Sequence, residues 1–124
     1  MPKKILIVDD EPDIVMMLKK QFETSGFEVD TAGDGQEGLA KAKKSSPDIL
    51  ILDEMMPRMD GYTVAGFLKS DARYKKIPII MFSARAEESD ANLSHEVGID
   101  LYLTKLVDFA ELLKKVNGLL EAKA

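Results

Sequence analysis

The sequence predicts a doubly wound α/β domain, in which helices cover both faces of a parallel sheet. Two observations predict this class. Short apolar runs bounded by turn-forming residues alternate with longer segments of helical periodicity, as is typical of strands buried on both faces. Each intervening segment is also long enough for a right-handed crossover between parallel strands. The chain has 124 residues, 45% of them hydrophobic, which suffices for one domain over residues 1–124 with a continuous core.

The first elements follow from apolar patterning and from helix start and stop signals. The run at 5–8 predicts a strand that ends on two aspartates. A helix follows, because Pro12 suits a first helical turn, where its missing N–H costs nothing. Gly26 is expected to end it, and 27–32 then alternates apolar or hydroxyl side chains with acidic ones, as a strand does. The apolar stripe of the helix is formed by Ile14, Val15, Leu18 and Phe22.

The middle of the chain repeats this alternation. Asp34, followed three residues later by Glu37, predicts the capped start of a second helix, which should end near residue 44. The run at 49–52 predicts the third strand. Asp60 and the glycine after it open a third helix, which should extend to about residue 70.

The last part of the chain completes the pattern. The run at 77–82 predicts the fourth strand, 86–97 a fourth helix and 101–104 the fifth strand. Asp108, again with a glutamate three residues later, predicts the start of the last helix. This helix is expected to bury Phe109, Leu112, Leu113, Val116, Leu119 and Leu120.

The strand order can also be predicted. The first, third, fourth and fifth strands each end on a charged or hydroxyl residue, and these residues are expected to cluster at one edge of the sheet. Only the second strand lies away from this cluster, which favours the order 2-1-3-4-5. The switch point then lies between the first and third strands, where open α/β sheets bind their ligands. Asp9, Asp10 and Asp53 would line that crevice.

Composition excludes several classes of function. The formal net charge of -5 and the pI near 4.9 argue against nucleic-acid binding, which needs a basic surface. The absence of cysteine excludes disulfides and thiolate chemistry. Apolar runs fall short of the ~20 residues of a membrane span, and the N-terminus lacks the apolar segment of a signal peptide. We therefore expect a cytoplasmic protein without membrane insertion.

Four strands end on residues that together could hold a phosphoryl group. Asp9 and Asp10 follow the first strand, while Asp53, Ser83 and Lys105 end the third, fourth and fifth. The carboxyl ends of parallel strands meet at one edge of the sheet. Crowded carboxylates favour a bound cation. Oxygen ligands with no cysteine and no nearby histidine favour Mg²⁺, or Mn²⁺, over zinc.

Each residue has a role in this chemistry and an ordinary alternative. Asp53, at the tip of the central strand, is the best nucleophile for an acyl phosphate. Asp9 and Asp10 would hold the metal, Lys105 would neutralise the phosphoryl group and Ser83 would donate a hydrogen bond. Singly, Asp10 could cap a helix, Ser83 could satisfy the backbone and Lys105 could be a surface lysine. Their joint position at strand ends favours a site.

These residues closely resemble the receiver domain of two-component response regulators. The stretch at 52–61, Leu-Asp-Glu-Met-Met-Pro-Arg-Met-Asp-Gly, carries the resemblance together with 5–11, 32–35, the pair Ser83-Ala84 and 102–105. The resemblance extends along the whole chain. It implies the flavodoxin-like (βα)5 fold, and it is closest to stand-alone chemotaxis regulators.

The resemblance implies a phosphoryl transfer. Asp53 would accept the phosphoryl group from a histidine kinase or a phosphotransfer protein. Mg²⁺ would be bound by Asp10, Asp53 and the backbone carbonyl of Met55, with Asp9 contributing through water. The only catalysis would be phosphorylation and dephosphorylation of the chain itself.

The resemblance also implies a switch. Ser83 and Lys105 would contact the phosphoryl oxygens, and Ser83 would move toward them. Tyr102 matches the aromatic residue that turns inward as the hydroxyl moves, although an aromatic packed on a neighbouring helix is the ordinary reading. The readout surface would be the helix at 86–97, the strand at 101–104 and the last helix, which would bind a downstream protein target.

Three positions modify this expectation. Met55 and Arg85 match the family's variable positions beside the path of the hydrolytic water, and their bulk predicts slow self-dephosphorylation. Leu106 stands where the family usually has a proline after the lysine. We expect a trans bond before Leu106 and a shifted or looser loop, which leaves the reach of Lys105 as a question for the structure.

Other functions compete with the phosphoacceptor switch. A degenerate receiver would be a phosphorylation-independent protein-binding module. A haloacid-dehalogenase-type phosphatase would want an aspartate at position 55, where this chain has methionine. A flavodoxin would want a Ser-, Thr- and Gly-rich loop after the first strand, where this chain is acidic. His95 is better read as a residue on the surface of a helix than as a phosphorelay histidine.

Overall fold

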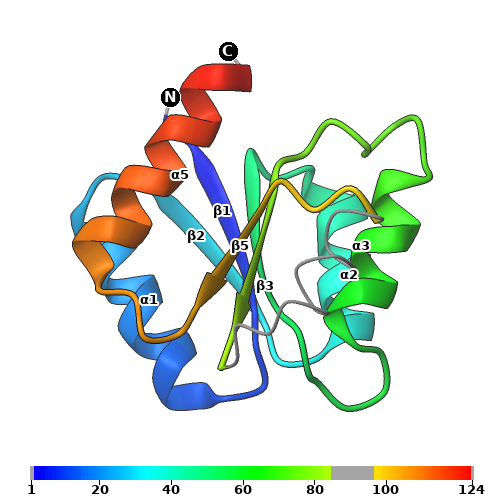
Figure 1. Ribbon diagram of the computed structural model, residues 1–124, viewed down its shortest axis with the longest axis horizontal. Helices are drawn as coiled ribbons and strands as arrows, with labels where there is room; N and C mark the ends of the chain where they lie inside the picture. Colours follow the sequence, from blue (N-terminus) through cyan, green and yellow to red (C-terminus); the bar gives the residue numbers. More distant parts are fainter. Residues whose placement is uncertain (1, 85–96, 124) are drawn as a thin grey trace.

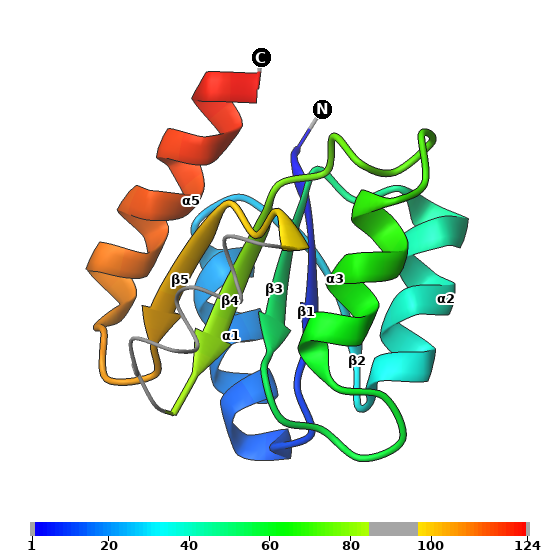
Figure 2. The same ribbon diagram turned by 45° about the vertical axis from the view of Figure 1, so that its right-hand side comes forward.

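The sheet has the predicted topology. The computed structural model describes residues 2–84 and 97–123, and five parallel strands pair in the order β2-β1-β3-β4-β5. Figure 2 shows β5, β4, β3 and β1 in turn. The strand bounds are β1 (Lys4–Val8), β2 (Glu28–Ala32), β3 (Ile49–Asp53), β4 (Ile79–Ser83) and β5 (Leu101–Thr104).

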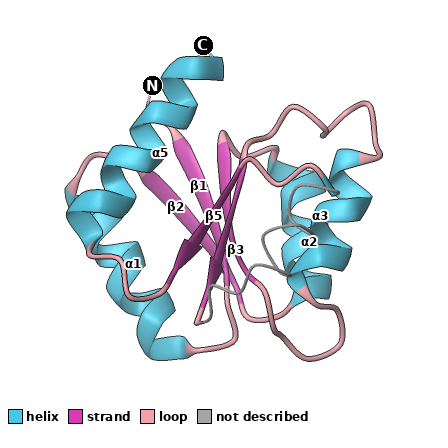
Figure 3. Cartoon of the chain, in the orientation of Figure 1, coloured by secondary structure: helices cyan, strands magenta, loops and turns pink. Residues whose placement is uncertain are grey.

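The helices form a layer on each side of the sheet. Figures 1 and 3 show α1 and α5 against one face and α2 and α3 against the other. The helix expected at 86–97 lies, except for Val97, outside the described residues. The bounds of the described helices are α1 (Pro12–Thr24), α2 (Gly35–Ser45), α3 (Gly61–Lys69) and α5 (Phe109–Lys123).

The two layers of helices enclose two apolar cores, one on each face of the sheet. Every residue of β3 and β4 is buried, because both faces of these strands are covered. At the edge of the sheet, β2 instead exposes Glu28 and Asp30 in alternation. In α5 only Leu112 and Val116 of the six expected core residues are fully buried, and the other four pack at the margin of their core.

Aspartates begin three of the helices as the sequence indicates. The side chains of Asp34, Asp60 and Asp108 each accept a hydrogen bond of 2.8 Å from the backbone N–H three residues later. In the first case the capping glutamate accepts from the N–H of Gly33 at 2.7 Å, one residue before the expected partner. These caps fix where the loops at the carboxyl edge of the sheet become helix.

Two further expectations concern single features. No cis peptide bond occurs among the described residues, so the predicted trans bond before Leu106 is confirmed, and the Leu106 side chain is 90% exposed. No helix of the described chain is both long and apolar enough to cross a bilayer.

Candidate functional site

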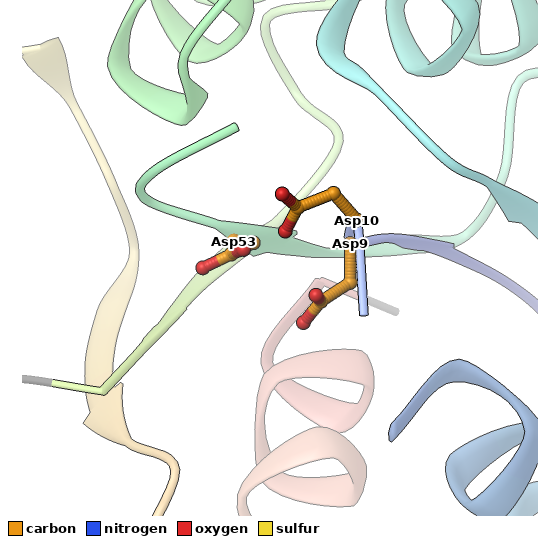
Figure 4. Close-up of side chains that lie close together, drawn as sticks. All are labelled: Asp9, Asp10 and Asp53. Atoms are coloured by element: carbon orange, nitrogen blue, oxygen red, sulfur yellow. The ribbon is translucent and has the colours of Figure 1, made fainter. Parts of the chain in front are cut away.

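Three carboxylates gather at the carboxyl edge of the sheet. Asp9 and Asp10 follow β1, Asp53 ends the adjacent β3, and Figure 4 shows their side chains close together. One oxygen from each lies within 4.8 Å of the others. Asp9 and Asp53 are buried, whereas Asp10 is exposed and keeps the cluster open to solvent. The set of hard oxygen donors, one of them reachable from water, fits Mg²⁺.

Burial and a neighbouring carboxylate raise the pKa of Asp53. Burial raises the pKa of this carboxyl to about 7, the charge of Asp9 adds to the rise, and the charge of Lys105 opposes it. An aspartate that keeps its proton up to neutral pH is only partly compensated by the positive charge near it. The site is therefore suited to a cation, which would favour the ionised form.

Lys105 reaches the acidic cluster despite the leucine that follows it. Its Nζ lies 2.9 Å from Oδ2 of Asp9 and 3.5 Å from Oδ1 of Asp53, and donates to Oε1 of Glu11 at 2.6 Å. The backbone N–H of Lys105 also donates to the carbonyl of Ser83 at 2.6 Å, which ties the start of the β5–α5 loop to the end of β4.

The ion pairs keep Lys105 charged. Burial alone would lower its pKa, but hydrogen bonds to Glu11 and Asp9, and then the charges of Asp9 and Asp53, raise the pKa above the usual range of lysine. The site thus holds a permanent cation beside Asp53. Sequence reasoning missed Glu11, because a lysine–glutamate pair separated by 94 positions leaves no local pattern.

Ser83 and Tyr102 both donate hydrogen bonds to Glu54, a residue for which the sequence predicted no role. Ser83 is buried and its Oγ donates to Oε2 of Glu54 at 2.6 Å, and the Tyr102 hydroxyl donates to the same oxygen at 3.2 Å. Glu54 is itself only 5% exposed. One sequence signal could have identified Glu54. A carboxylate directly after a strand that is buried on both faces has little access to solvent and therefore needs hydrogen-bond donors within the protein.

Of the three other residues considered from the sequence, only Met55 belongs to the part of the chain that the structure describes. The Met55 side chain is exposed in the β3–α3 loop. Arg85 and His95 lie outside the described residues.

The loop that carries Asp53 into α3 is tightly packed. The N–H of Gly61 donates to the carbonyl of Glu54 at 2.9 Å. Arg58 adopts a φ of 69°, and its guanidinium donates to Oδ2 of Asp34 at 2.6 Å. A Cβ at Gly61 would overlap the carbonyl oxygen of Asp53. The absence of a side chain at Gly61 is therefore what lets α3 begin against the end of β3.

We expect Gly61→Ala to reduce the free energy of unfolding by about 1–3 kcal/mol, because the added methyl group must push the Asp53 backbone aside. Gly66→Ala in the same helix is the matched control. A Cβ there meets nothing within 4 Å, so it should stabilise by about 0.5–1 kcal/mol. Urea denaturation measures both, and equal effects of the two variants would contradict the packing argument.

Comparisons with known proteins agree with this geometry. The family model of the response regulator receiver domain matches residues 5–117. The alkaline phosphatase synthesis transcriptional regulatory protein PhoP of Bacillus subtilis is 42% identical over 120 residues, which cover 97% of this chain and 49% of PhoP. The chain thus spans about half the length of that relative.

Solved structures show the same fold. The chemotaxis protein CheY4 of Vibrio cholerae matches with a TM-score of 0.91 at 33% identity, covering 96% of this chain and 99% of that one. TrrA of Thermotoga maritima, solved in complex with Mg²⁺ and BeF, matches with a TM-score of 0.85 at 38% identity, covering 94% and 98%.

Proposed function

The chain belongs to the response regulator receiver family, and from that premise we propose that it accepts a phosphoryl group on Asp53 with the help of Mg²⁺. The observation that supports this most is the joint position of Lys105 and the three carboxylates. A permanent cation contacts Asp53 and Asp9, and the carboxylates offer the donor set for a divalent ion.

The residues divide the work of the transfer. A carboxylate oxygen of Asp53 attacks the phosphorus of a donor phosphohistidine, the N–P bond breaks, and the imidazole takes up a proton. Asp10, Asp53 and the Met55 carbonyl would hold Mg²⁺, with Asp9 contributing through water, and the ion would supply positive charge to the phosphoryl oxygens. Lys105 adds a second positive charge from the side of β5, and Ser83 donates a hydrogen bond.

The geometry favours this function over a phosphorylation-independent binding module. That alternative depended on Leu106 displacing Lys105, yet the Lys105 ammonium lies at the carboxylates. A module that merely binds partners has no need for a largely enclosed lysine bridging two buried aspartates.

The test is the intact mass of the protein after incubation with acetyl phosphate. The wild-type chain should gain one phosphoryl group with Mg²⁺ and none with EDTA. Asp53→Asn should gain none in either buffer, while Asp60→Asn, which keeps its helix cap, should behave as wild type. No gain by the wild-type chain under saturating donor would favour the binding module.

The phosphoryl donor is proposed to be a histidine kinase or a phosphotransfer protein in the cytoplasm. Exposed apolar side chains surround the acidic cluster and would suit a protein donor. Met16 of α1 lines the same hollow as Asp9 and Asp10, Met17 lines another with Lys105, and the exposed Leu106 follows Lys105.

The output is proposed to pass through a protein target that binds β5, α5 and the segment at 86–97, which lies outside the described residues except for Val97. PhoP is named as a transcriptional regulatory protein. For this chain we propose a signalling role as a single receiver, with any DNA contact made by another domain or protein.

We expect Met55→Asn combined with Arg85→Glu to speed the loss of the phosphoryl group by about tenfold. Met55 follows Asp53 by two residues and its side chain is exposed, and a shorter polar side chain there would admit and orient the attacking water. Phosphate release after removal of acetyl phosphate measures the rate. A rate within twofold of wild type would contradict the idea that these positions screen water.

A further inference from the structure

A buried carboxylate connects the two residues of the proposed switch. Glu54 lies directly after Asp53, is 5% exposed, and accepts hydrogen bonds from Ser83 and Tyr102 on one oxygen, Oε2. The shorter of the two, 2.6 Å, lies at the short end of the range for O–H···O hydrogen bonds. The mechanism above assigns no task to Glu54.

A serine hydroxyl has one proton to donate. While that proton points to Glu54, Ser83 cannot donate it to a phosphoryl oxygen on Asp53. Phosphorylation therefore sets up a competition between two acceptors, Glu54 and the phosphoryl group, for a single donor. When Ser83 turns toward the phosphoryl group, the hydroxyl of Tyr102 gains a better share of Oε2, because one competing donor has left.

We propose that Glu54 is a positioning residue that holds the Ser83 hydroxyl away from the phosphoryl site and couples its release to Tyr102. This inference rests on the proposed function. A ligand shifts such an equilibrium only by its differential affinity for the two arrangements, so the bond to Glu54 lowers the apparent affinity of the site for a phosphoryl group.

A purely structural reading makes different predictions. If Glu54 only satisfied buried hydroxyls, its removal would change stability and leave ligand affinity alone. If only its charge mattered, its removal would raise the affinity for any anion at Asp53 whether or not Ser83 were present. A double-mutant cycle with Ser83 separates these readings from a positioning role.

Beryllofluoride with saturating Mg²⁺ is the probe, since it binds as a phosphoryl mimic without covalent transfer. The protein carries ¹³C-labelled tyrosine, and Tyr102→Phe assigns the Tyr102 resonance among the three tyrosines. Titration, followed by the ¹⁹F resonance of bound beryllofluoride, gives the half-saturating concentration for wild type, Glu54→Leu and Glu54→Gln, each with Ser83 and with Ser83→Ala. The control is Glu23→Leu, which removes a charge near the C-terminal end of α1, the end away from the acidic cluster.

Glu54→Leu should lower the half-saturating concentration about tenfold, which corresponds to ~1.4 kcal/mol. Glu54→Gln keeps the shape of the side chain and a neutral acceptor, so it should lower the half-saturating concentration about threefold. This variant also serves as the test if Glu54→Leu folds poorly. With Ser83→Ala, both gains should fall below twofold. The Tyr102 resonance should move on binding in wild type and much less in Glu54→Leu.

Contrary outcomes are distinct. Equal affinities for wild type and both Glu54 variants would overturn the inference and leave the proposed function standing. An equal gain with and without the Ser83 hydroxyl would assign the effect to charge, and would also overturn it. Failure of wild type to bind beryllofluoride at all would overturn the proposed function and the inference with it.

Discussion

Lys105→Met is expected to slow phosphorylation by acetyl phosphate about 10²–10³-fold while tightening the binding of Mg²⁺ severalfold. Removal of one preorganised charge from a developing oxyanion costs about this much in rate. Because the Lys105 charge opposes the rise in the pKa of Asp53, its loss also leaves more of the nucleophile protonated at neutral pH.

The opposite effect on the metal follows from the same contacts. The Lys105 ammonium is the cation that faces Asp9 and Asp53 in the metal-free protein. Without it the carboxylates repel one another more strongly, and a divalent ion gains more by binding between them. Stability without metal should fall by about 3 kcal/mol, as it does when one partner of a buried ion pair is removed.

Lys69→Met is the matched control. The Lys69 side chain is 13% exposed against 11% for Lys105, and its Nζ donates to Asp100 at 2.9 Å. This ion pair lies at the amino end of β4, since Asp100 also accepts from the N–H of Ile79 at 2.8 Å. The control should lose stability yet keep its phosphorylation rate. Equal slowing in both variants, or weaker Mg²⁺ binding in Lys105→Met, would contradict the assigned role.

The sequence was sufficient to predict the sheet and the backbone positions of the site. The strand order followed from one contrast, because only the second strand did not end on a residue of the charged and hydroxyl cluster. The structure places β2 at the edge of the sheet, where Glu28 and Asp30 are exposed. Once the order is known, the parallel register places the ends of β1, β3, β4 and β5 together.

The sequence was not sufficient to predict which side chains pair within the site. Glu11 and Glu54 belong to the motifs that carried the resemblance, but the contacts of Glu11 with Lys105 and of Glu54 with Ser83 and Tyr102 depend on rotamers and on long-range packing. Periodicity also fails at Glu54. Every residue of β3 is buried, so alternation no longer tells which side chain faces solvent.

Asp53→Asn is expected to raise the free energy of unfolding of the metal-free protein by about 2 kcal/mol at pH 8 and by less than about 1 kcal/mol at pH 4.5. The folded protein holds the pKa of Asp53 at about 7, because of burial and the charge of Asp9, whereas an unfolded aspartate has a pKa near 3.9. Between these values the folded state keeps a proton that the unfolded state releases.

The sign follows from linkage. Where the folded state binds more protons at Asp53, the contribution of this group to the stability of the wild-type protein falls as pH rises, here from about pH 4 to about pH 7. The upper limit for this pKa difference is ~4 kcal/mol. We expect about half of it, because the crevice opens to water beside the exposed Asp10. Asparagine cannot ionise, so the variant should lack this slope.

Urea denaturation in EDTA across pH 4.5–8.5 measures the effect, with Asp60→Asn as the control that retains the wild-type slope. Mg²⁺ should reverse the order of the two proteins at pH 8. A ligand at 100 times its Kd stabilises by about 2.7 kcal/mol, and wild type should gain most of this while Asp53→Asn gains little. Equal pH slopes for wild type and Asp53→Asn in EDTA would show that Asp53 is already ionised and that Lys105 alone compensates the cluster.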